Sequence, residues 1–169
     1  SIDMIVAFNQ EGLLTQYNQA FAVEFGLEFG EDATEYPFRT FIATQEEGDR
    51  VRNELLENSN FSGETIGKRL NGEHFPMFLT VAMLKDENDE TFGAMAVGRD
   101  ITEAKLAQEE LEASEERYRS ILDNANDAIF TLDEGGFFTY TNPSFNELLG
   151  YSELELSKRT VHDVITNLP

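Results

Sequence analysis

The sequence contains no cysteine. This absence excludes disulfide bonds, thiolate nucleophiles and metal sites with cysteine ligands. Histidine is nearly as scarce, because the chain has only His74 and His162, which are far apart in the sequence. No glycine-rich loop that could cradle a phosphate accompanies them. We therefore expect no catalytic residues, no metal ligands and no enzymatic activity in this stretch of chain.

Basic residues are also few, with 12 Lys and Arg against 33 Asp and Glu and a formal net charge of −21. Such an excess of negative charge opposes binding to nucleic acid and to anionic membrane surfaces. The sequence has no apolar run long enough to span a bilayer and no signal-peptide pattern. We expect a cytoplasmic location, no nucleic-acid partner and no direct membrane contact.

The chain does contain enough apolar material for a packed core, with 40% hydrophobic residues and 14 Phe. Two short β-prone runs, residues 3–9 and 13–18, flank a polar turn and predict a hairpin. Asn18 is a good N-cap for the helix that follows, and Gly26 is a good C-terminal residue for it.

The next segment, residues 27–43, is interrupted by Gly and Pro and predicts short irregular helical turns. Its aromatic residues are expected to pack inward: Phe29, Phe38 and Phe41. Thr44 and Glu47 have the spacing of a capping box for a helix that extends to about Asn58. The apolar face of that helix is predicted to consist of Val51, Leu55 and Leu56.

A three-stranded meander is predicted over residues 62–101. Asn71-Gly72 is a strong hairpin signal between its first two strands. The middle strand, residues 73–85, alternates apolar side chains on one face. These are Phe75, Met77, Leu79, Val81 and Met83.

A long charged helix follows the meander. Residues 103–122 contain no Gly or Pro and are rich in good helix formers. The Thr102 hydroxyl is expected to cap the first free amides of this helix. Small and apolar residues recur at alternating spacings of three and four, as in a heptad seam. The seam comprises Ala104, Ala107, Leu111, Ser114, Tyr118, Ile121 and Ala125.

This seam admits two interpretations. The helix is either a dimer helix, joined through the bulky members Leu111, Tyr118 and Ile121, or a solvated helix lying on its own domain. Because the seam is short and includes Ala and Ser, a coiled coil built on it is expected to be weak alone.

The opening of the chain is repeated 124 residues later without a gap. The offset superposes Asn18 on Asn142, Phe21 on Phe145 and Gly26 on Gly150. The second copy continues to about Ile165 and includes no counterpart of the meander. Its hairpin is therefore expected to expose apolar side chains. These are Ile129, Phe130, Leu132, Phe137 and Phe138.

Three stretches of the chain resemble the PAS domain family. The run GRDITEAK, residues 98–105, resembles that family's junction between the last strand and the following helix. EASEERYRSILDNANDAIF, residues 112–130, resembles a linker that enters a following PAS domain, and NPSFNELLGYS, residues 142–152, resembles the family's first helix. The resemblance covers nearly the whole chain.

The resemblance implies an α+β fold with a five-stranded antiparallel sheet in strand order 2-1-5-4-3 and helices on one face. A complete PAS domain is expected over residues 1–102 and a linker helix over 103–124. Residues 125–169 are expected to form the first part of a second PAS domain. In this family Asp100, Ile101 and Thr102 would join the sheet to the helix and relay a signal.

The resemblance also places a set of side chains around the family's ligand pocket. The set comprises Phe8, Phe21, Phe25, Phe38, Phe41, Leu55, Phe75, Met77 and Leu79. The alternative is that these residues simply fill a packed core, which we favour. No haem is expected because the predicted helix at residues 45–58 has no His, and no flavin adduct is expected because the chain has no Cys. The identity of any small organic ligand stays open.

These features predict a sensory module of a larger signalling protein, such as a two-component histidine kinase with a phosphorelay. The module would detect or relay a stimulus through its sheet to the helical linker and a downstream output domain. We expect it to form a homodimer through the linker helix. The alternative function is a PAS scaffold for dimerisation or protein interaction that binds no small ligand.

Overall fold

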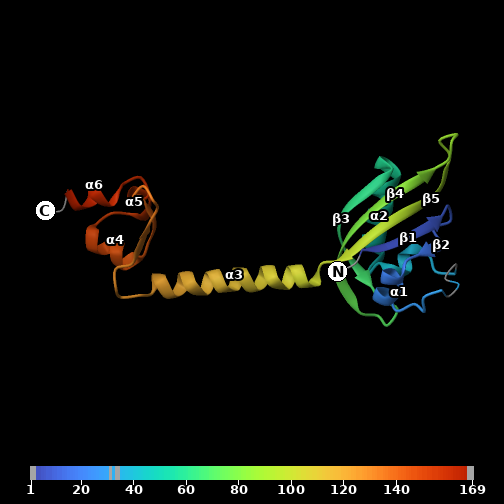
Figure 1. The fold of residues 1–169 in the computed structure, drawn as a ribbon, viewed down its shortest axis with the longest axis horizontal. Helices are drawn as coiled ribbons and strands as arrows, with labels where there is room; N and C mark the ends of the chain where they lie inside the picture. The colour runs from blue at the N-terminus through green and yellow to red at the C-terminus, as the bar shows by residue number, and fades with distance from the viewer. Residues whose placement is uncertain (1–2, 31, 33–34, 167–169) are drawn as a thin grey trace. The chain divides into compact units, whose positions relative to one another are not determined.

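A sheet with helices on one face forms most of the first half of the chain (Figure 1). The computed structural model describes residues 3–30, 32 and 35–166. The chain divides into two compact units, residues 1–106 and 107–169. In the first unit the chain runs through β1 (Met4–Asn9), β2 (Leu14–Tyr17), α1 (Gln19–Phe25), the 3-10 helix η1 (Phe38–Phe41), α2 (Gln45–Asn58), β3 (Asn60–Lys68), β4 (His74–Lys85), β5 (Thr91–Asp100) and the start of α3 (Thr102–Asp123).

The five strands of the first unit are antiparallel and hydrogen-bonded in the order β2-β1-β5-β4-β3. This order confirms the α+β fold predicted from the sequence. Strand β1 lies inside the sheet, since Val6 pairs with Tyr17 on β2 and with Ala96 on β5. The first two strands are therefore completed by β5, the last strand of the first unit, about ninety residues later.

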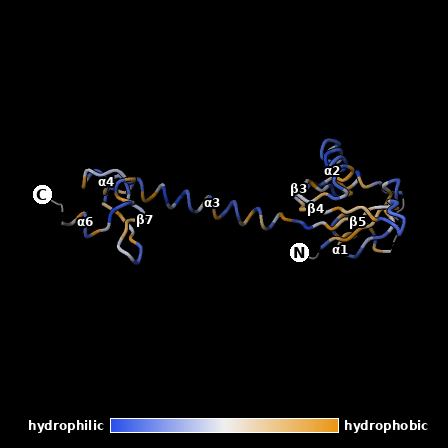
Figure 2. The backbone as a smooth tube through the Cα atoms, turned by 90° about the horizontal axis from the view of Figure 1, so that it is seen from above, coloured by the Kyte–Doolittle hydropathy of each residue, from blue (hydrophilic) through white to orange (hydrophobic). Residues whose placement is uncertain are grey.

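The core lies between the sheet and its helices. Side chains alternate along a strand, so β4 buries one of its faces and leaves the other to solvent. Figure 2 shows the apolar colouring concentrated on the strands, whereas α2 is largely hydrophilic. The buried cluster draws on every element of the sheet and on α1, η1 and α2, and it includes Phe8, Leu14, Phe21, Phe25, Phe41, Val51, Phe61, Phe75, Met77 and Leu79.

The turn and cap signals of the sequence are confirmed where they act locally. The Asn18 side chain accepts a hydrogen bond from the Phe21 amide, and Gly26 ends α1 with φ of 82°. At the β3–β4 hairpin the Arg69 amide donates to the Glu73 carbonyl at 2.8 Å, and Gly72 has φ of 92°. Glycine suits both positions because a side chain disfavours the left-handed region.

Two inward-facing predictions are wrong. Phe29 is exposed and contacts the ring of Tyr17 edge-on at the surface. Leu56 is also exposed, because it lies five residues after buried Val51 and is turned by about 140° around α2. The Leu56 error arises because the sequence does not say how wide the buried face of a helix is, whereas Phe29 lies in a loop between α1 and η1.

The capping box at the start of α2 forms only in part. The Thr44 hydroxyl accepts a hydrogen bond from the Glu47 amide at 3.2 Å, as predicted. The Glu47 carboxylate does not return to Thr44 and instead accepts from Arg50 and Thr65, both at 2.8 Å. These bonds lower the pKa of Glu47, with the bond to Arg50 as the larger cause.

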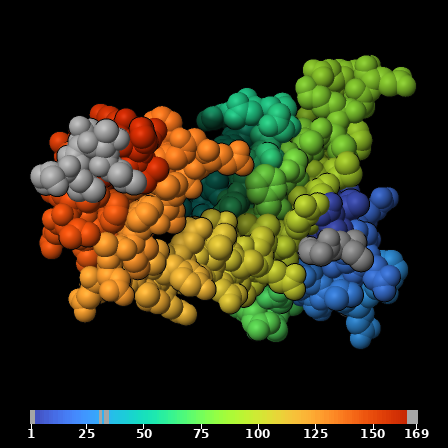
Figure 3. All heavy atoms as spheres, turned by 60° about the vertical axis from the view of Figure 1, so that its left-hand side comes forward, coloured from blue at the N-terminus to red at the C-terminus, as the bar shows by residue number. Residues whose placement is uncertain are grey.

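The loop between β4 and β5 projects from the end of the sheet (Figures 1 and 3). The Asp86 carboxylate accepts hydrogen bonds from the amides of Asn88 at 2.8 Å and Glu90 at 2.9 Å. Asp89 completes the turn with φ of 65°. These backbone bonds lower the pKa of Asp86 and hold an exposed loop in one conformation.

The second unit holds a hairpin and short helices. Its elements after α3 are β6 (Phe130–Leu132), β7 (Phe138–Thr141), α4 (Pro143–Leu149), α5 (Glu153–Leu156) and α6 (Val161–Thr166). Phe138, Phe145, Leu156 and Val164 form its small buried core.

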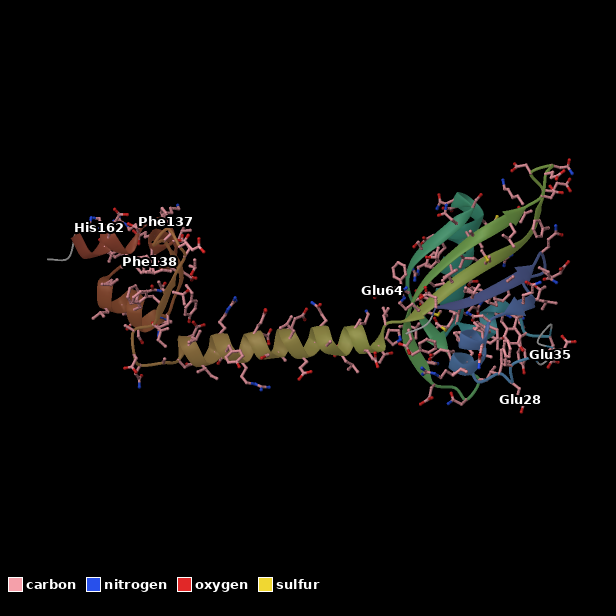
Figure 4. The ribbon with its side chains drawn as sticks, in the orientation of Figure 1. Glu28, Glu35, Glu64, Phe137, Phe138 and His162 are labelled. Atoms are coloured by element: carbon pink, nitrogen blue, oxygen red, sulfur yellow. The ribbon has the colours of Figure 1, made fainter. Side chains whose placement is uncertain are left out.

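The exposure predicted for the second hairpin is confirmed for Phe130, Leu132 and Phe137 and is wrong for Phe138, which is buried. Ile129 is half-buried. Phe137 and Phe138 are adjacent on the hairpin (Figure 4), and alternation along β7 turns only Phe138 toward α4 and α5.

Helix α3 is exposed along its length and buries none of its side chains. Among the residues that the structure describes, no helix combines the length and the apolar character needed to cross a bilayer.

Candidate functional site

Seven of the nine side chains predicted to line a ligand pocket surround one small cavity in the core of the first unit. They are Phe8, Phe21, Phe25, Phe38, Phe41, Met77 and Leu79. The cavity measures about 20 Å³, room for about one water-sized particle. The aromatic rings occupy most of the space, with Phe21, Phe25 and Phe41 centred 4.6 to 5.0 Å from one another.

The other two predicted pocket residues lie elsewhere. Leu55 is half-buried on α2 at the margin of the core. Phe75 is buried, with its ring 5.5 Å from that of Phe25, and the guanidinium of Arg69 lies 4.3 Å from its ring centre. Phe75 therefore links the core to a polar cluster at its edge.

A haem or flavin does not fit this core as it is packed. Cofactor pockets have volumes of about 300 to 1,000 Å³, far above the space present. Helix α2 offers no histidine, and the chain offers no cysteine.

The polar cluster lies where β5 passes into α3. Asp100, the last residue of β5, accepts a hydrogen bond from the Thr102 amide at 2.7 Å through Oδ1. Its other oxygen, Oδ2, lies 3.3 Å from Nη2 of Arg69. The same guanidinium nitrogen contacts Glu24 of α1. One arginine thus joins α1 to the end of β5.

The members of this cluster are partly buried, which sets it apart from ordinary surface ion pairs. The side chains of Arg69, Glu24 and Asp100 are 25%, 25% and 22% exposed. Reduced solvent screening strengthens each charge–charge contact, and a shared partner makes the three groups interdependent. We call Glu24, Arg69 and Asp100 the junction cluster.

Arg69 and Glu24 were not among the site residues predicted from the sequence. Arg69 lies 45 residues from Glu24 and 31 from Asp100. Its position just before the Asn71-Gly72 turn was the one available signal, because that turn fixes the end of β3 near the start of β4.

The three residues predicted to join sheet and helix do so in different ways. Ile101 donates its amide to the Pro76 carbonyl at 3.1 Å and accepts from the Lys105 amide at 2.9 Å. The prediction for the Thr102 hydroxyl is wrong. Thr102 is already inside the helix, its amide is bound by Asp100, and its buried Oγ1 has no hydrogen-bond partner within the described structure.

A second contact fixes the first turn of α3 to the sheet. Lys105 lies 2.5 Å from the Glu64 carboxylate on β3, and Figure 4 shows Glu64 at the end of the sheet from which α3 departs. This pair is more exposed than the junction cluster, so it contributes less.

The bulky side chains of the predicted dimer seam are exposed to solvent on α3. Leu111, Tyr118 and Ile121 are all exposed, as is Leu106, which lies off the seam.

The C-terminal end of α3 is held by side chains of the second unit. The Asn142 amide nitrogen donates to the carbonyls of Leu122 at 3.1 Å and Asp127 at 2.8 Å. The Tyr140 hydroxyl donates to Asp123 at 2.8 Å. Burial, followed by this hydrogen bond, raises the pKa of Tyr140 to about 12.

The histidines are not part of either arrangement. His74 is exposed at the start of β4, and His162 is exposed on α6 (Figure 4). In the described part of the chain, no three His, Asp or Glu side chains converge as a metal site would require.

Two family models match the chain. A model described as a PAS domain matches residues 2–103, and a model described as the PAS fold matches residues 116–168. Phytochrome 1 of Selaginella martensii is 27% identical over 128 residues, which are 73% of this chain and 11% of that protein. The chain thus spans only about a tenth of the length of this relative.

Solved structures show the same fold. A PAS domain from Colwellia psychrerythraea is 21% identical with a TM-score of 0.54, and the match covers 60% of this chain and 87% of that one. The dark structure of the blue-light photoreceptor aureochrome1 LOV is 18% identical with a TM-score of 0.53, over 66% of this chain and 86% of that one. With its sheet order and a family match over most of its length, the chain belongs to the PAS domain family of sensory modules.

Proposed function

We propose that the first unit detects or relays a stimulus and passes it through the junction cluster to α3. The observation that carries this proposal is the position of Arg69, which touches the core through Phe75 and the start of α3 through Asp100. A change in core packing that moves Phe75 therefore displaces the guanidinium. Because Asp100 also binds the Thr102 amide, such a displacement changes how α3 begins.

The context we propose is a multidomain sensor, such as a cytoplasmic histidine kinase, with an output domain downstream. Three observations support a relay between domains. Helix α3 is one continuous helix of 22 residues, and a second PAS match begins within it at residue 116. Asn142 and Tyr140 of the second unit donate hydrogen bonds to the last two residues of α3.

Within this stretch of chain we propose neither catalysis nor a bound haem or flavin adduct. The proposal rests on the missing ligand and nucleophile residues and on the volume of the core cavity. The unit would respond through packing, with a change in the core as the input.

The test replaces Arg69 and measures amide exchange in α3. In Arg69→Met, amide exchange in the first turns of α3 should accelerate by roughly five-fold, which corresponds to about 1 kcal/mol of lost local stability. Arg99→Met is the matched control, since Arg99 precedes Asp100 on β5 but points to the opposite face of the strand, where it pairs with Asp3 at 2.7 Å. Unchanged exchange in Arg69→Met, or equal changes in both variants, would contradict the relay.

The second candidate function is a scaffold that dimerises through the seam of α3. The exposure of Leu111, Tyr118 and Ile121 favours it, because burying each side chain is worth about 1.5 to 3 kcal/mol. Replacing Leu111 and Ile121 together by Asp should give monomers in light scattering. Leu106→Asp is the control, since Leu106 is 60% exposed against 57% for Leu111 but lies off the seam. A dimer mass that survives the double replacement would place the interface elsewhere.

A further inference from the structure

The seam on α3 is uneven, because its small residues lie mainly at one end of the helix and its bulky residues at the other. In chain order, the seam residues within the helix are Ala104, Ala107, Leu111, Ser114, Tyr118 and Ile121. The structure describes α3 along its whole length, and none of its side chains is buried. This face is therefore open to a second copy of the chain.

Two copies of α3 can pair in a parallel or an antiparallel direction, and each direction stacks different residues. A parallel pair in register places every seam residue against itself, so its first two layers hold only Ala and a later layer holds two Tyr118 rings. An antiparallel pair centred on the helix midpoint, between Glu112 and Ala113, instead places each small residue against a bulky one. Such alternation fills a packed interface evenly. The layers are Ala104 with Ile121, Ala107 with Tyr118, and Leu111 with Ser114.

Two charged residues beside the seam have no partner of opposite charge in their own helix. Glu110 and Arg117 lie on the same flank of the seam, one heptad apart. The residues three and four positions away from each are only Leu, Ala, Ser and Ile. Arg119, in contrast, has Glu115 and Glu116 at these spacings, where helical ion pairs form. Glu110 and Arg117 are therefore free to pair across an interface.

These flanking charges favour the antiparallel direction. Antiparallel helices bring the same flank of the seam together, so Glu110 of each copy lies beside Arg117 of the other and two attractive pairs form. Parallel helices bring opposite flanks together, so Glu110 faces Glu115 of the other copy and two repulsions result. Sliding the antiparallel pair by one heptad in either direction brings two Glu110 or two Arg117 side chains together. Charge thus selects both the direction and the register that packing selects.

We propose that the seam of α3 is an antiparallel interface for a second copy of this chain, centred on the helix midpoint and aligned by Glu110 and Arg117. The proposal rests on the scaffold function proposed above and adds a direction and a register to it. In this arrangement Thr102 of one copy lies level with Asp123 of the other. The helix start that Asp100 binds therefore lies beside the helix end of the second copy.

Single cysteines report the direction, because the natural chain has none. A disulfide requires Cα atoms within about 7 Å of each other. In the antiparallel pair Ala107 is level with Tyr118 of the second copy, so the two Ala107 residues are about 16 Å apart along the axis and Ala107→Cys should not cross-link to itself. An oxidised equal mixture of Ala104→Cys and Ile121→Cys should give the mixed disulfide in several-fold excess over either homodimer. Efficient self-linking of Ala107→Cys would show a parallel pair and overturn the proposal.

Charge reversal tests the direction without altering the seam itself. Glu110→Lys should raise the dissociation constant of the dimer about five- to ten-fold, because two attractions become repulsions. In a parallel pair the same change would lower it. Adding Arg117→Glu should restore the natural value to within about two-fold. Glu109→Lys is the matched control, since it changes the net charge equally on the face opposite the seam. Tighter association of Glu110→Lys in sedimentation equilibrium, or no recovery in the double variant, would overturn the proposal.

The outcomes separate this proposal from the scaffold function on which it rests. A chain that stays monomeric at every concentration would overturn both. If Asp at Leu111 and Ile121 dissociates the dimer but Ala107→Cys links to itself, the scaffold function stands and only the antiparallel direction is overturned.

Discussion

The two copies of the repeat build the same hairpin in different surroundings. Asn18 and Asn142 each accept hydrogen bonds from two amides, those of Ile5 and Phe21 in the first copy and their counterparts 124 residues later in the second, all at 2.9 to 3.0 Å. Each hairpin also has its bulge at the same place and a glycine with φ near 80° in its turn. The geometry of this motif is therefore set locally.

Burial is where the copies differ. Val6 and Phe8 are 4% and 5% exposed, whereas their counterparts Phe130 and Leu132 are 42% and 38% exposed. In the first unit β5 pairs with the far edge of β1, and these side chains lie in the large core that the sheet forms with α1, η1 and α2. In the described part of the second unit β6 pairs only with β7. Local hydrogen bonding thus specifies the hairpin, whereas the burial of its apolar side chains depends on segments distant in the sequence.

The largest difference between the two units is expected when the buried aromatic ring near the start of α1 or α4 is removed. Phe21→Ala and Phe145→Ala should each cost about 3 to 5 kcal/mol. The first unit has a large core and should stay folded, whereas the second has a core of four buried residues and should unfold. Amide exchange at Ile5 and Ile129 reports the two units in one sample. Retained protection of Ile129 in Phe145→Ala would show that the second unit is not marginal.

Removing the asparagine tests the locally set geometry. Asn142→Ala should cost about 2 to 4 kcal/mol, because Asn142 is fully buried and the amides of Ile129 and Phe145 lose their acceptor. Asn18→Ala should cost less, since Asn18 is half-buried and water can replace part of its bonding. Asn142→Asp keeps the acceptor but loses the amide nitrogen that donates to the Leu122 and Asp127 carbonyls, so it should also destabilise the second unit. Equal losses in both Ala variants, measured by denaturation, would contradict this ranking.

Alkaline pH should destabilise the second unit through a group that the first unit lacks at the corresponding position. Tyr140 has a pKa raised to about 12 from an ordinary value of 10.0, mainly by burial and then by Asp123. Since the raised pKa belongs to the folded state, the neutral phenol stabilises the second unit fully below pH 10, and this contribution is lost as the pH rises from 10 to 12. The first unit has Gln16 at the corresponding position, which does not titrate. Tyr140→Phe should remove this part of the pH dependence from a stability curve.

The smallest effect is expected at the glycines that end the two helices, where replacement by Ala should cost both units the same stability. Gly26 and Gly150 end their helices with φ of 82° and 69°, and a methyl group at either would meet no atom within 4 Å. Each replacement by Ala should therefore cost only the backbone strain, about 1 kcal/mol. Unequal losses, measured by exchange within each unit, would mean that the two helix ends differ in more than conformation.

The features that could be predicted from the sequence are those whose cause lies within a few residues. The Asn18 cap, the Gly26 terminus and the Asn71-Gly72 turn depend on neighbouring atoms alone, and the alternation along β4 depends on strand geometry. The strand order came from the family resemblance, because pairing β1 with β5 joins residues about ninety positions apart.

The misjudged features depend on distant partners. Arg69 has no nearby sequence signal for its bonds to Glu24 and Asp100. The Thr102 hydroxyl is an exception with a local cause, because Asp100, two residues before it, binds the helix amide in its place. The volume of the core cavity also has no sequence signal. It depends on how well the aromatic rings of α1 and η1 fill the space left by Ala96 and Gly98.

The β4–β5 loop offers a practical handle on this protein. Its conformation depends on the Asp86 carboxylate and on main-chain amides, so the side chain of Asn88 at its tip can be exchanged with the loss of only one long contact of 3.5 Å. Asn88→Cys would create a single thiol in the chain, in an exposed position. A fluorophore or spin label attached there could be introduced in one chemical step, without first removing any native cysteine.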